Sequence, residues 1–146
     1  MYLKNRKAFT MLELVFVIVI IGILSAIAIP KFSATANLAQ MSKGKSTLAT
    51  VRSALATERQ KNILRGTGST AISIYNASGR IFTRFTDVNG SRILDNDLPR
   101  CTELGCWSVS SGTYTFYREA TPNCTYTITN NRFVDTTTGG CTELED

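Results

Sequence analysis

Residues 9 to 29 read FTMLELVFVIVIIGILSAIAI, an apolar run with a single charged side chain at Glu13. The first proline of the chain, Pro30, follows directly after this run. As an α-helix with a rise of ~1.5 Å per residue, the run covers ~30 Å, which is the thickness of the hydrocarbon core of a bilayer. The sequence therefore predicts a helix that can span a membrane.

The residues before this run are basic: they carry three cationic side chains and no acid, namely Lys4, Arg6 and Lys7. The positive-inside rule predicts that residues 1–8 stay in the cytoplasm and that the remainder crosses the membrane. A removable secretory signal has the same order of regions, and small residues that could serve its cleavage site are present at Ser25, Ala26 and Ala28. Hydropathy alone leaves the removable signal and the uncleaved anchor open.

The carboxylate of Glu13 separates these two possibilities. Ionised residues at the centre of a membrane helix cost on the order of 2.5 to 3.5 kcal/mol on insertion scales, so one that is present indicates a partner or a pathway. A position shallow enough to reach the headgroups is the alternative for Glu13.

The motif Lys7-Ala8-Phe9-Thr10-Met11-Leu12-Glu13, followed by the apolar run and Pro30, resembles the class III signal of type IV prepilins and type II secretion pseudopilins. The resemblance implies cleavage between Ala8 and Phe9, N-methylation of Phe9 and a role for Glu13 in subunit assembly. The family overwhelmingly has glycine before the cut, whereas this chain has Ala8. The resemblance weakens quickly beyond the apolar run.

Such a cleavage has a physical rationale. It frees an α-amino group on the membrane-embedded end of the helix, and Glu13 of a neighbouring subunit can neutralise that group. The ion pair would also fix the axial offset between neighbouring helices, and a filament requires such a register.

The sequence from 31 to 65 predicts an amphipathic helix that continues the apolar one. Its apolar residues recur at helical spacing, at Leu38, Met41, Leu48, Val51 and Leu55. Gly66 and Gly68 are expected to end the helix. Gly22 and Pro30 are the positions where it is expected to kink or melt locally when it moves between environments. A simple bend at the membrane surface is the alternative for Pro30.

Residues 69 to 146 predict strands separated by turn signals. The expected strands are 71–75, 80–86, 107–109, 113–118, 124–129 and 132–134, with Asn130 and Asn131 as a two-residue hairpin turn. We expect an antiparallel sheet of about four strands packed on the carboxyl half of the helix. The fold class is therefore α+β. The resemblance implies a pilin-like arrangement of it, with a leader at 1–8, a membrane or filament-core helix half at 9–30 and a head at 31–146.

Four cysteines, Cys101, Cys106, Cys124 and Cys141, lie in the predicted head. An even set on one side of a membrane span indicates disulfides in an oxidising compartment. Zinc is the alternative, but the spacings fit its ligand patterns poorly and the chain has no histidine. Three pairings are possible, and we expect the local one, which brackets a tight turn and the last hairpin.

Charge and residue types disfavour most other functions. The net charge is +5, yet residues 66–146 carry six arginines against nine acids, so a basic stalk joins an acidic head. This balance argues against a nucleic-acid partner, although Tyr75 could form a basic, aromatic face together with Arg80, Arg84 and Arg92. Asp95 and Asp97 are expected to form a solvated turn, with a calcium site as the alternative. We nominate no catalytic residue, metal or cofactor.

The sequence therefore favours a structural filament subunit over an enzyme. By the resemblance, its partners are identical copies, a prepilin peptidase, membrane lipid, and an inner-membrane assembly platform driven by an ATPase. The precursor is expected in the bacterial inner membrane with its head in the periplasm, and later in a filament. A type II secretion pseudopilin and a DNA-uptake minor pilin are the alternatives.

Overall fold

The computed structural model describes residues 9–68, 70–86 and 90–145. Contacts divide the chain into an amino-terminal unit, Met1–Ala36, and a head unit, Asn37–Asp146. The expected leader at 1–8, including Ala8, lies outside the described residues. Each unit is described by itself below.

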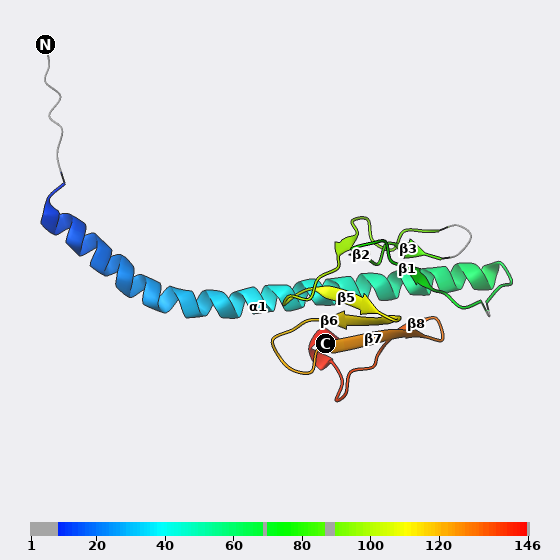
Figure 1. Ribbon diagram of the computed structural model, residues 1–146. Coiled ribbons are helices and arrows are strands. Elements are labelled where there is room, and N and C mark those ends of the chain that lie inside the picture. Colours follow the sequence, from blue (N-terminus) through cyan, green and yellow to red (C-terminus); the bar gives the residue numbers. More distant parts are fainter. Residues whose placement is uncertain (1–8, 69, 87–89, 146) are drawn as a thin grey trace, which may run out of the picture. The chain divides into compact units, whose positions relative to one another are not determined.

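Helix α1 (Met11–Leu64) is the main helical element, and Pro30 lies inside it (Figure 1). Its amino-terminal end is closed by Thr10, whose hydroxyl accepts a hydrogen bond from the backbone N–H of Glu13 at 3.2 Å. This is the N-cap contact in which a side-chain oxygen satisfies one of the free N–H groups of the first turn.

The carboxyl end of α1 is closed by Gly66, as the sequence predicted. The glycine has φ +77°, a left-handed conformation that costs other residues energy. Its N–H donates to the carbonyl of Ile63 at 3.0 Å, and the N–H of Thr67 donates to that of Asn62 at 2.8 Å. These two bonds form a Schellman motif and end the helix.

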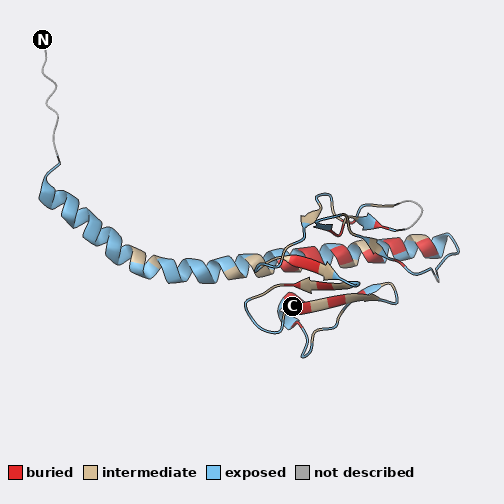
Figure 2. Ribbon diagram, in the orientation of Figure 1, coloured by how far each residue is buried: buried red, intermediate tan, exposed pale blue. Residues whose placement is uncertain are grey.

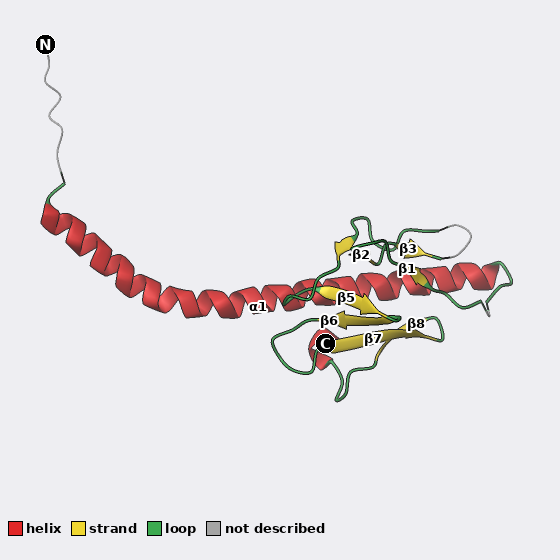
Figure 3. Ribbon diagram, viewed as in Figure 1, coloured by secondary structure: helices red, strands yellow, loops and turns green. Residues whose placement is uncertain are grey.

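A four-stranded antiparallel sheet is the largest sheet among the described residues of the head (Figure 3). Its strands follow chain order: β5 (Trp107–Ser110), β6 (Thr113–Phe116), β7 (Cys124–Thr129) and β8 (Arg132–Asp135). Asn130 and Asn131 join the last two strands with φ values of 52° and 58°, which is the geometry of a type I′ hairpin turn. The prediction of about four antiparallel strands and of this turn is confirmed.

The remaining strands form two short pairs. Strand β1 (Ile74–Tyr75) pairs with β3 (Arg84–Phe85), and β2 (Arg80–Ile81) pairs with β4 (Leu98–Pro99), both antiparallel. In Figure 1, β2 and β3 are drawn on the opposite side of α1 from β7 and β8.

The prediction of one strand over 80–86 is therefore wrong. The chain is interrupted at Phe82, which has φ +54°. The ring of Phe82 is fully buried and stacks on Tyr114 with centroids 5.0 Å apart. In addition, the backbone N–H of Phe82 donates to the side-chain oxygen of Asn76 at 2.9 Å. Burial of the ring outweighs the local preference for an extended strand.

The core of the head joins one stripe of α1 to the aromatic side chains of the sheet. Figure 2 shows buried positions in red on the carboxyl half of α1 and on the strands of the sheet. Leu48, Val51 and Leu55 are at most 1 % exposed. The buried aromatic residues of the sheet are Trp107, Tyr114, Phe116, Tyr126 and Phe133. The predicted amphipathic helix is confirmed at these three stripe positions.

Leu38 does not belong to this stripe, although the spacing suggested that it did. Its side chain is 71 % exposed. At about 100° per residue, Leu38 lies roughly 120° around the helix from the centre of the buried positions. The reason is that the spacings of three and four residues between Leu38 and Leu55 average less than the 3.6 residues of one helical turn. Met41, one turn later, is partly buried against the core.

The helix approaches the sheet closely at Gly44. A Cβ atom built on it would lie 2.5 Å from Cζ of Phe116, whose ring is fully buried. We expect Gly44→Leu to destabilise the full chain by about 1 to 3 kcal/mol through overpacking, despite the better helix propensity of leucine. Urea unfolding in detergent measures this, with Ser46→Leu on the exposed face as the control. Equal stability of the two variants would contradict the prediction.

Candidate functional site

The amino-terminal unit has an apolar surface that its own chain does not cover. Of its described residues, all are exposed except Ser25 and Ala28, which are half-buried. Among the described residues, α1 is the one helix with a window long and apolar enough to cross a membrane, and no residue of that window is buried. An apolar surface of this extent indicates contact with lipid or with other subunits.

The predicted processing and assembly residues lie at the start of this unit. Phe9 is 77 % exposed and precedes the helix, while Glu13 is exposed in its first turn. The sequence interpretation overlooked the role of Thr10. The spacing Thr-x-x-Glu at the start of an apolar run is the signal that could have indicated this cap.

The two predicted hinge positions lie within continuous helix. Around Gly22, nothing lies within 4 Å of a built Cβ, and α1 also continues through Pro30. A proline there removes one helical hydrogen bond. Kinking or local melting at Gly22 and Pro30 during assembly stays a prediction.

In the head, the four cysteines form two local disulfides. Cys101 pairs with Cys106 and Cys124 pairs with Cys141, each pair with a Cα–Cα distance of 5.6 Å. The second pair connects β7 to the start of the short terminal helix α2 (Thr142–Glu145). Of the three pairings that the sequence left open, the structure has the local one.

Asp135 fastens the turn that carries Cys141. Its two carboxylate oxygens accept hydrogen bonds from the backbone N–H of Thr137 at 2.7 Å and of Cys141 at 2.6 Å. Burial by itself would raise the pKa of Asp135, but the hydrogen bonds from Thr137 and Cys141 and the nearby Arg52 outweigh it and lower the pKa. The charged carboxylate therefore stabilises this turn.

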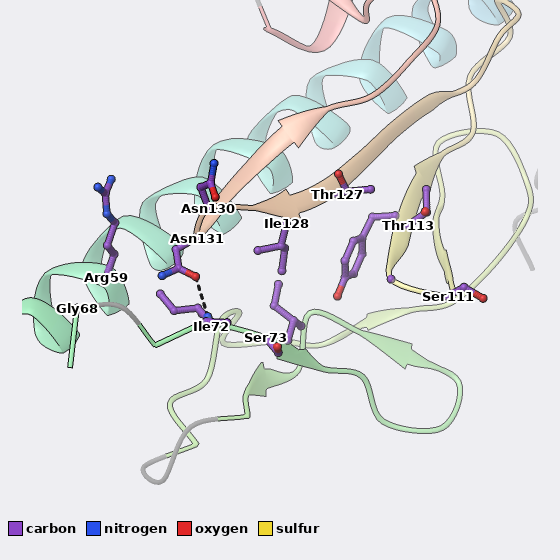
Figure 4. Close-up of a pocket in the computed structure, with 14 residues that line it drawn as sticks. Arg59, Gly68, Ile72, Ser73, Ser111, Thr113, Thr127, Ile128, Asn130 and Asn131 are labelled. Atoms are coloured by element: carbon purple, nitrogen blue, oxygen red, sulfur yellow. Dashed lines mark hydrogen bonds between the residues drawn. The ribbon is translucent and has the colours of Figure 1, made fainter.

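A groove of about 750 Å³ lies in the head at the turn ends of the sheet (Figure 4). Ser111 and Thr113 border it from one hairpin, and Asn130 and Asn131 from the other. Asn131 is engaged by the chain itself: its Oδ1 accepts from the N–H of Ile72 at 2.8 Å, and its Nδ2 donates to the carbonyl of Thr70 at 3.0 Å. These bonds fasten the chain after α1 to the sheet.

The two aspartates considered for a calcium site have different surroundings. Asp97 is engaged by arginines, since its carboxylate lies 3.4 Å from the guanidinium of Arg92 and its carbonyl accepts from Arg80 at 2.9 Å. Asp95 is exposed. Within the described residues, no group of three or more His, Cys, Asp or Glu side chains is placed to hold a metal ion.

The structure does bring together the residues considered for a basic, aromatic face. Tyr75 pairs with Arg84 across β1 and β3, and the backbone of Arg84 forms an isolated antiparallel β-bridge with that of Arg92. The guanidinium of Arg84 lies 4.8 Å from the centre of the Tyr75 ring. Arg80 reaches the same area through its bond to Asp97.

Glu58 is a buried charge to which the sequence interpretation assigned no role. It is 1 % exposed, and one of its oxygens lies 3.0 Å from Nζ of Lys61 while the other lies 3.9 Å from the guanidinium of Arg65. The signal was available, because Glu58 follows Val51 and Leu55 at the spacing of the buried stripe.

A helix with an uncovered apolar first half, followed by a disulfide-linked head in which the same helix packs on an antiparallel sheet, is the α+β layout of a pilin-like subunit. A family profile described as "Prokaryotic N-terminal methylation motif" matches residues 3–29. This segment contains Ala8, Phe9 and Glu13.

A curated relative extends the likeness beyond the motif. The chain is 49 % identical over 61 residues to "Type IV narrow pilus major component PilA5" of Thermus thermophilus, an alignment that covers 40 % of this chain and 53 % of the relative. The chain thus matches about half the length of that relative. No solved structure gives a significant match. The two matches support a similarity between this chain and the type IV pilin family.

Replacing Asp135 with asparagine tests the turn that holds Cys141. The amide of Asp135→Asn directs a donor at one of the two N–H groups, so we expect a loss of about 1 to 3 kcal/mol at neutral pH. Because the folded pKa lies below the ordinary value of 3.8, this contribution is present above 3.8 and is lost as pH falls through the folded pKa. Urea unfolding of the full chain in detergent should therefore show a difference at pH 7 that narrows below pH 3.8. The control is Asp95→Asn, and an equal effect of both variants would contradict the assignment.

Proposed function

We propose that this protein is a structural subunit of a type IV pilus-like filament and not an enzyme. In this proposal a prepilin peptidase cleaves the precursor between Ala8 and Phe9 and Phe9 becomes N-methylated. The mature subunit is then assembled from the inner membrane. The observation that carries the proposal is the uncovered apolar surface of the amino-terminal unit, which lies within a matched methylation motif.

The apolar surface requires an apolar environment both before and after assembly. Before assembly the surface is accommodated by lipid, because a helix satisfies all of its backbone polar groups internally. After assembly the same surface can pack against the equivalent helices of other copies. Transfer between lipid and a helical bundle costs little hydrophobic energy, since both are apolar, so specific polar contacts decide the register.

Glu13 is the residue that we propose for this register. Its exposed carboxylate lies in the first turn of α1, close in sequence to the amino group that cleavage before Phe9 would create. An ion pair between Glu13 of one subunit and Phe9 of its neighbour neutralises two charges that are unfavourable separately in apolar surroundings. Each subunit would then carry one donor and one acceptor of the same contact.

The partners in this proposal are identical copies of the chain, a prepilin peptidase, membrane lipid, and an inner-membrane platform with its ATPase. The precursor is anchored in the bacterial inner membrane with its head in the periplasm. The basic leader at 1–8 supports this orientation, because positive residues favour the cytoplasmic side.

Two related functions share the same amino-terminal motif. A type II secretion pseudopilin would assemble in the same way but would not extend from the cell surface as a long filament. A DNA-uptake minor pilin would use Tyr75, Arg84 and Arg92 to bind nucleic acid, and an electrophoretic shift assay would identify it. The match to a major pilus component favours the structural subunit.

Processing can be tested by intact mass. We expect native protein from membrane and sheared-surface fractions, analysed without reductant, to begin at methylated Phe9 and to carry four oxidised cysteines. A chain that retains residues 1–8, or one cut after the apolar run, would refute the proposal.

Assembly can be tested at Glu13. The variant Glu13→Gln keeps the shape and removes the charge, so we expect normal cleavage at Phe9 but at least roughly tenfold fewer filaments, because the register contact loses its ion pair. Mass spectrometry measures the processing and electron microscopy of sheared fractions measures the filaments. The matched control is Glu119→Gln in the head, which should leave the filament yield unchanged. Normal filament yield from Glu13→Gln would contradict the assigned role.

A further inference from the structure

A row of three side chains crosses the β1–β3 pair and the backbone bridge beside it. Tyr75 lies opposite Arg84, and Arg84 lies opposite Arg92. Residues directly opposite each other project from the same face with Cβ atoms ~5 Å apart. All three side chains are exposed. We call Tyr75, Arg84 and Arg92 the tyrosine–arginine row.

Among the described residues, the positive charge of this row is neutralised only in part. Like charges directly opposite each other across strands are unfavourable. Arg92 has a carboxylate neighbour, Asp97, at 3.4 Å, whereas the guanidinium of Arg84 lies over the ring of Tyr75 at 4.8 Å. A carboxylate supplied from outside would relieve the repulsion between Arg84 and Arg92.

A second surface feature of the head has the complementary chemistry. The loop 101–106, closed by the Cys101–Cys106 disulfide and here called the disulfide loop, carries Glu103 and Leu104 at its tip. Leu104 is 48 % exposed. Glu103 is also exposed, and its carboxylate has no hydrogen-bond or ion-pair partner among the described residues.

The disulfide loop is fixed at its base by the disulfide and by two backbone hydrogen bonds. The N–H of Gly105 donates to the carbonyl of Tyr117 at 2.8 Å, and the N–H of Tyr117 donates to that of Cys106 at 2.9 Å. Gly105 has φ +77°, and a Cβ on it would lie 2.7 Å from Cγ of Gln40 on α1. A loop ordered in advance loses little entropy when it binds, which favours its use as a contact.

We propose that the disulfide loop of one subunit docks on the tyrosine–arginine row of a second copy. This inference rests on the proposed function of the chain as a filament subunit. Glu103 pairs with Arg84 and Arg92 of the other copy, and Leu104 packs beside the ring of Tyr75. The contact joins two different surfaces of the same chain, so it is heterologous and can repeat without closing.

The two surfaces are displaced along the helix within the head. The disulfide loop contacts α1 at Gln40, whereas Arg92 borders a cavity of about 450 Å³ together with Ala54 of α1. Gln40 and Ala54 are 14 residues apart, which corresponds to ~21 Å along a helix. Docking would therefore place one copy further along the axis than the other, as a filament requires.

Charge favours a second copy over nucleic acid as the occupant. The row is short, and residues 66–146 carry nine acids against six arginines, so a long polyanion would meet repulsion beyond the row. A single carboxylate on a rigid loop carries only the charge that the row can neutralise.

The first test is charge reversal in the full chain, expressed in filament-forming cells. We expect Glu103→Arg and Arg84→Glu each to lower the yield of sheared filaments at least roughly tenfold, because each places like charges in the contact. The double variant restores an opposite-charge pair at one of the two arginine positions, while Arg92 is unchanged, and should raise the yield well above that of either single variant. Matched controls are Asp95→Arg and Arg132→Glu, which reverse exposed charges outside both surfaces and should assemble normally.

The outcomes separate the inference from the proposed function. If the wild-type chain forms no filaments, the proposed function itself fails. If the wild-type chain assembles but the single variants also assemble normally, or the double variant does not recover, the docking contact is refuted while the filament function stands. Loss of DNA binding in Arg84→Glu with normal assembly would identify nucleic acid as the occupant and likewise overturn the contact.

A cross-link supplies an independent measurement of proximity. The double variant Leu104→Cys with Tyr75→Cys should give a ladder of disulfide-linked chains in sheared filaments on a non-reducing gel. Leu104→Cys with Ile63→Cys is the control, because Ile63 is exposed at 56 % but lies outside the row. Intact filaments without a ladder in the test variant would refute the contact.

Discussion

The packing of one helical stripe against one face of an antiparallel sheet is the interaction on which the head depends. Leu48, Val51 and Leu55 supply the helical side, and a cluster of aromatic rings supplies the other. The glycine at 44 lets the helix approach the ring of Phe116 closely. Because the same helix extends toward the amino terminus without such a sheet, its burial changes abruptly along its length, and this change separates the stable head from the part that needs other molecules.

Much of this layout could be predicted from local sequence patterns. The apolar run, the glycine that ends α1 and the hairpin at Asn130 and Asn131 are all determined by residues close together in the chain. Such features depend on helical periodicity and turn preferences, which operate over a few residues. The four-stranded sheet also followed from its turn signals and its alternation of apolar and polar residues.

The remaining features depend on contacts between distant segments. The reversal at Phe82 is stabilised by rings more than twenty residues away in sequence, so its strand pattern was misleading. The register that places Arg84 between Tyr75 and Arg92 requires the pairing of three short segments. The burial of Glu58 likewise depends on how the head closes over α1. At the amino-terminal site, Phe9 and Glu13 could be identified from the sequence. The N-cap at Thr10 was overlooked, although the Thr-x-x-Glu spacing that indicates it is local.

The bonds from Asp135 to the turn that follows it have a consequence for the order of covalent events. They hold the backbone of Cys141 close to the strand that precedes the turn, and β7 with Cys124 pairs with that strand. The two thiols are therefore brought together by noncovalent folding of the last hairpin, at a high effective concentration for each other. This proximity favours the local partner over Cys101 or Cys106 when the thiols are oxidised.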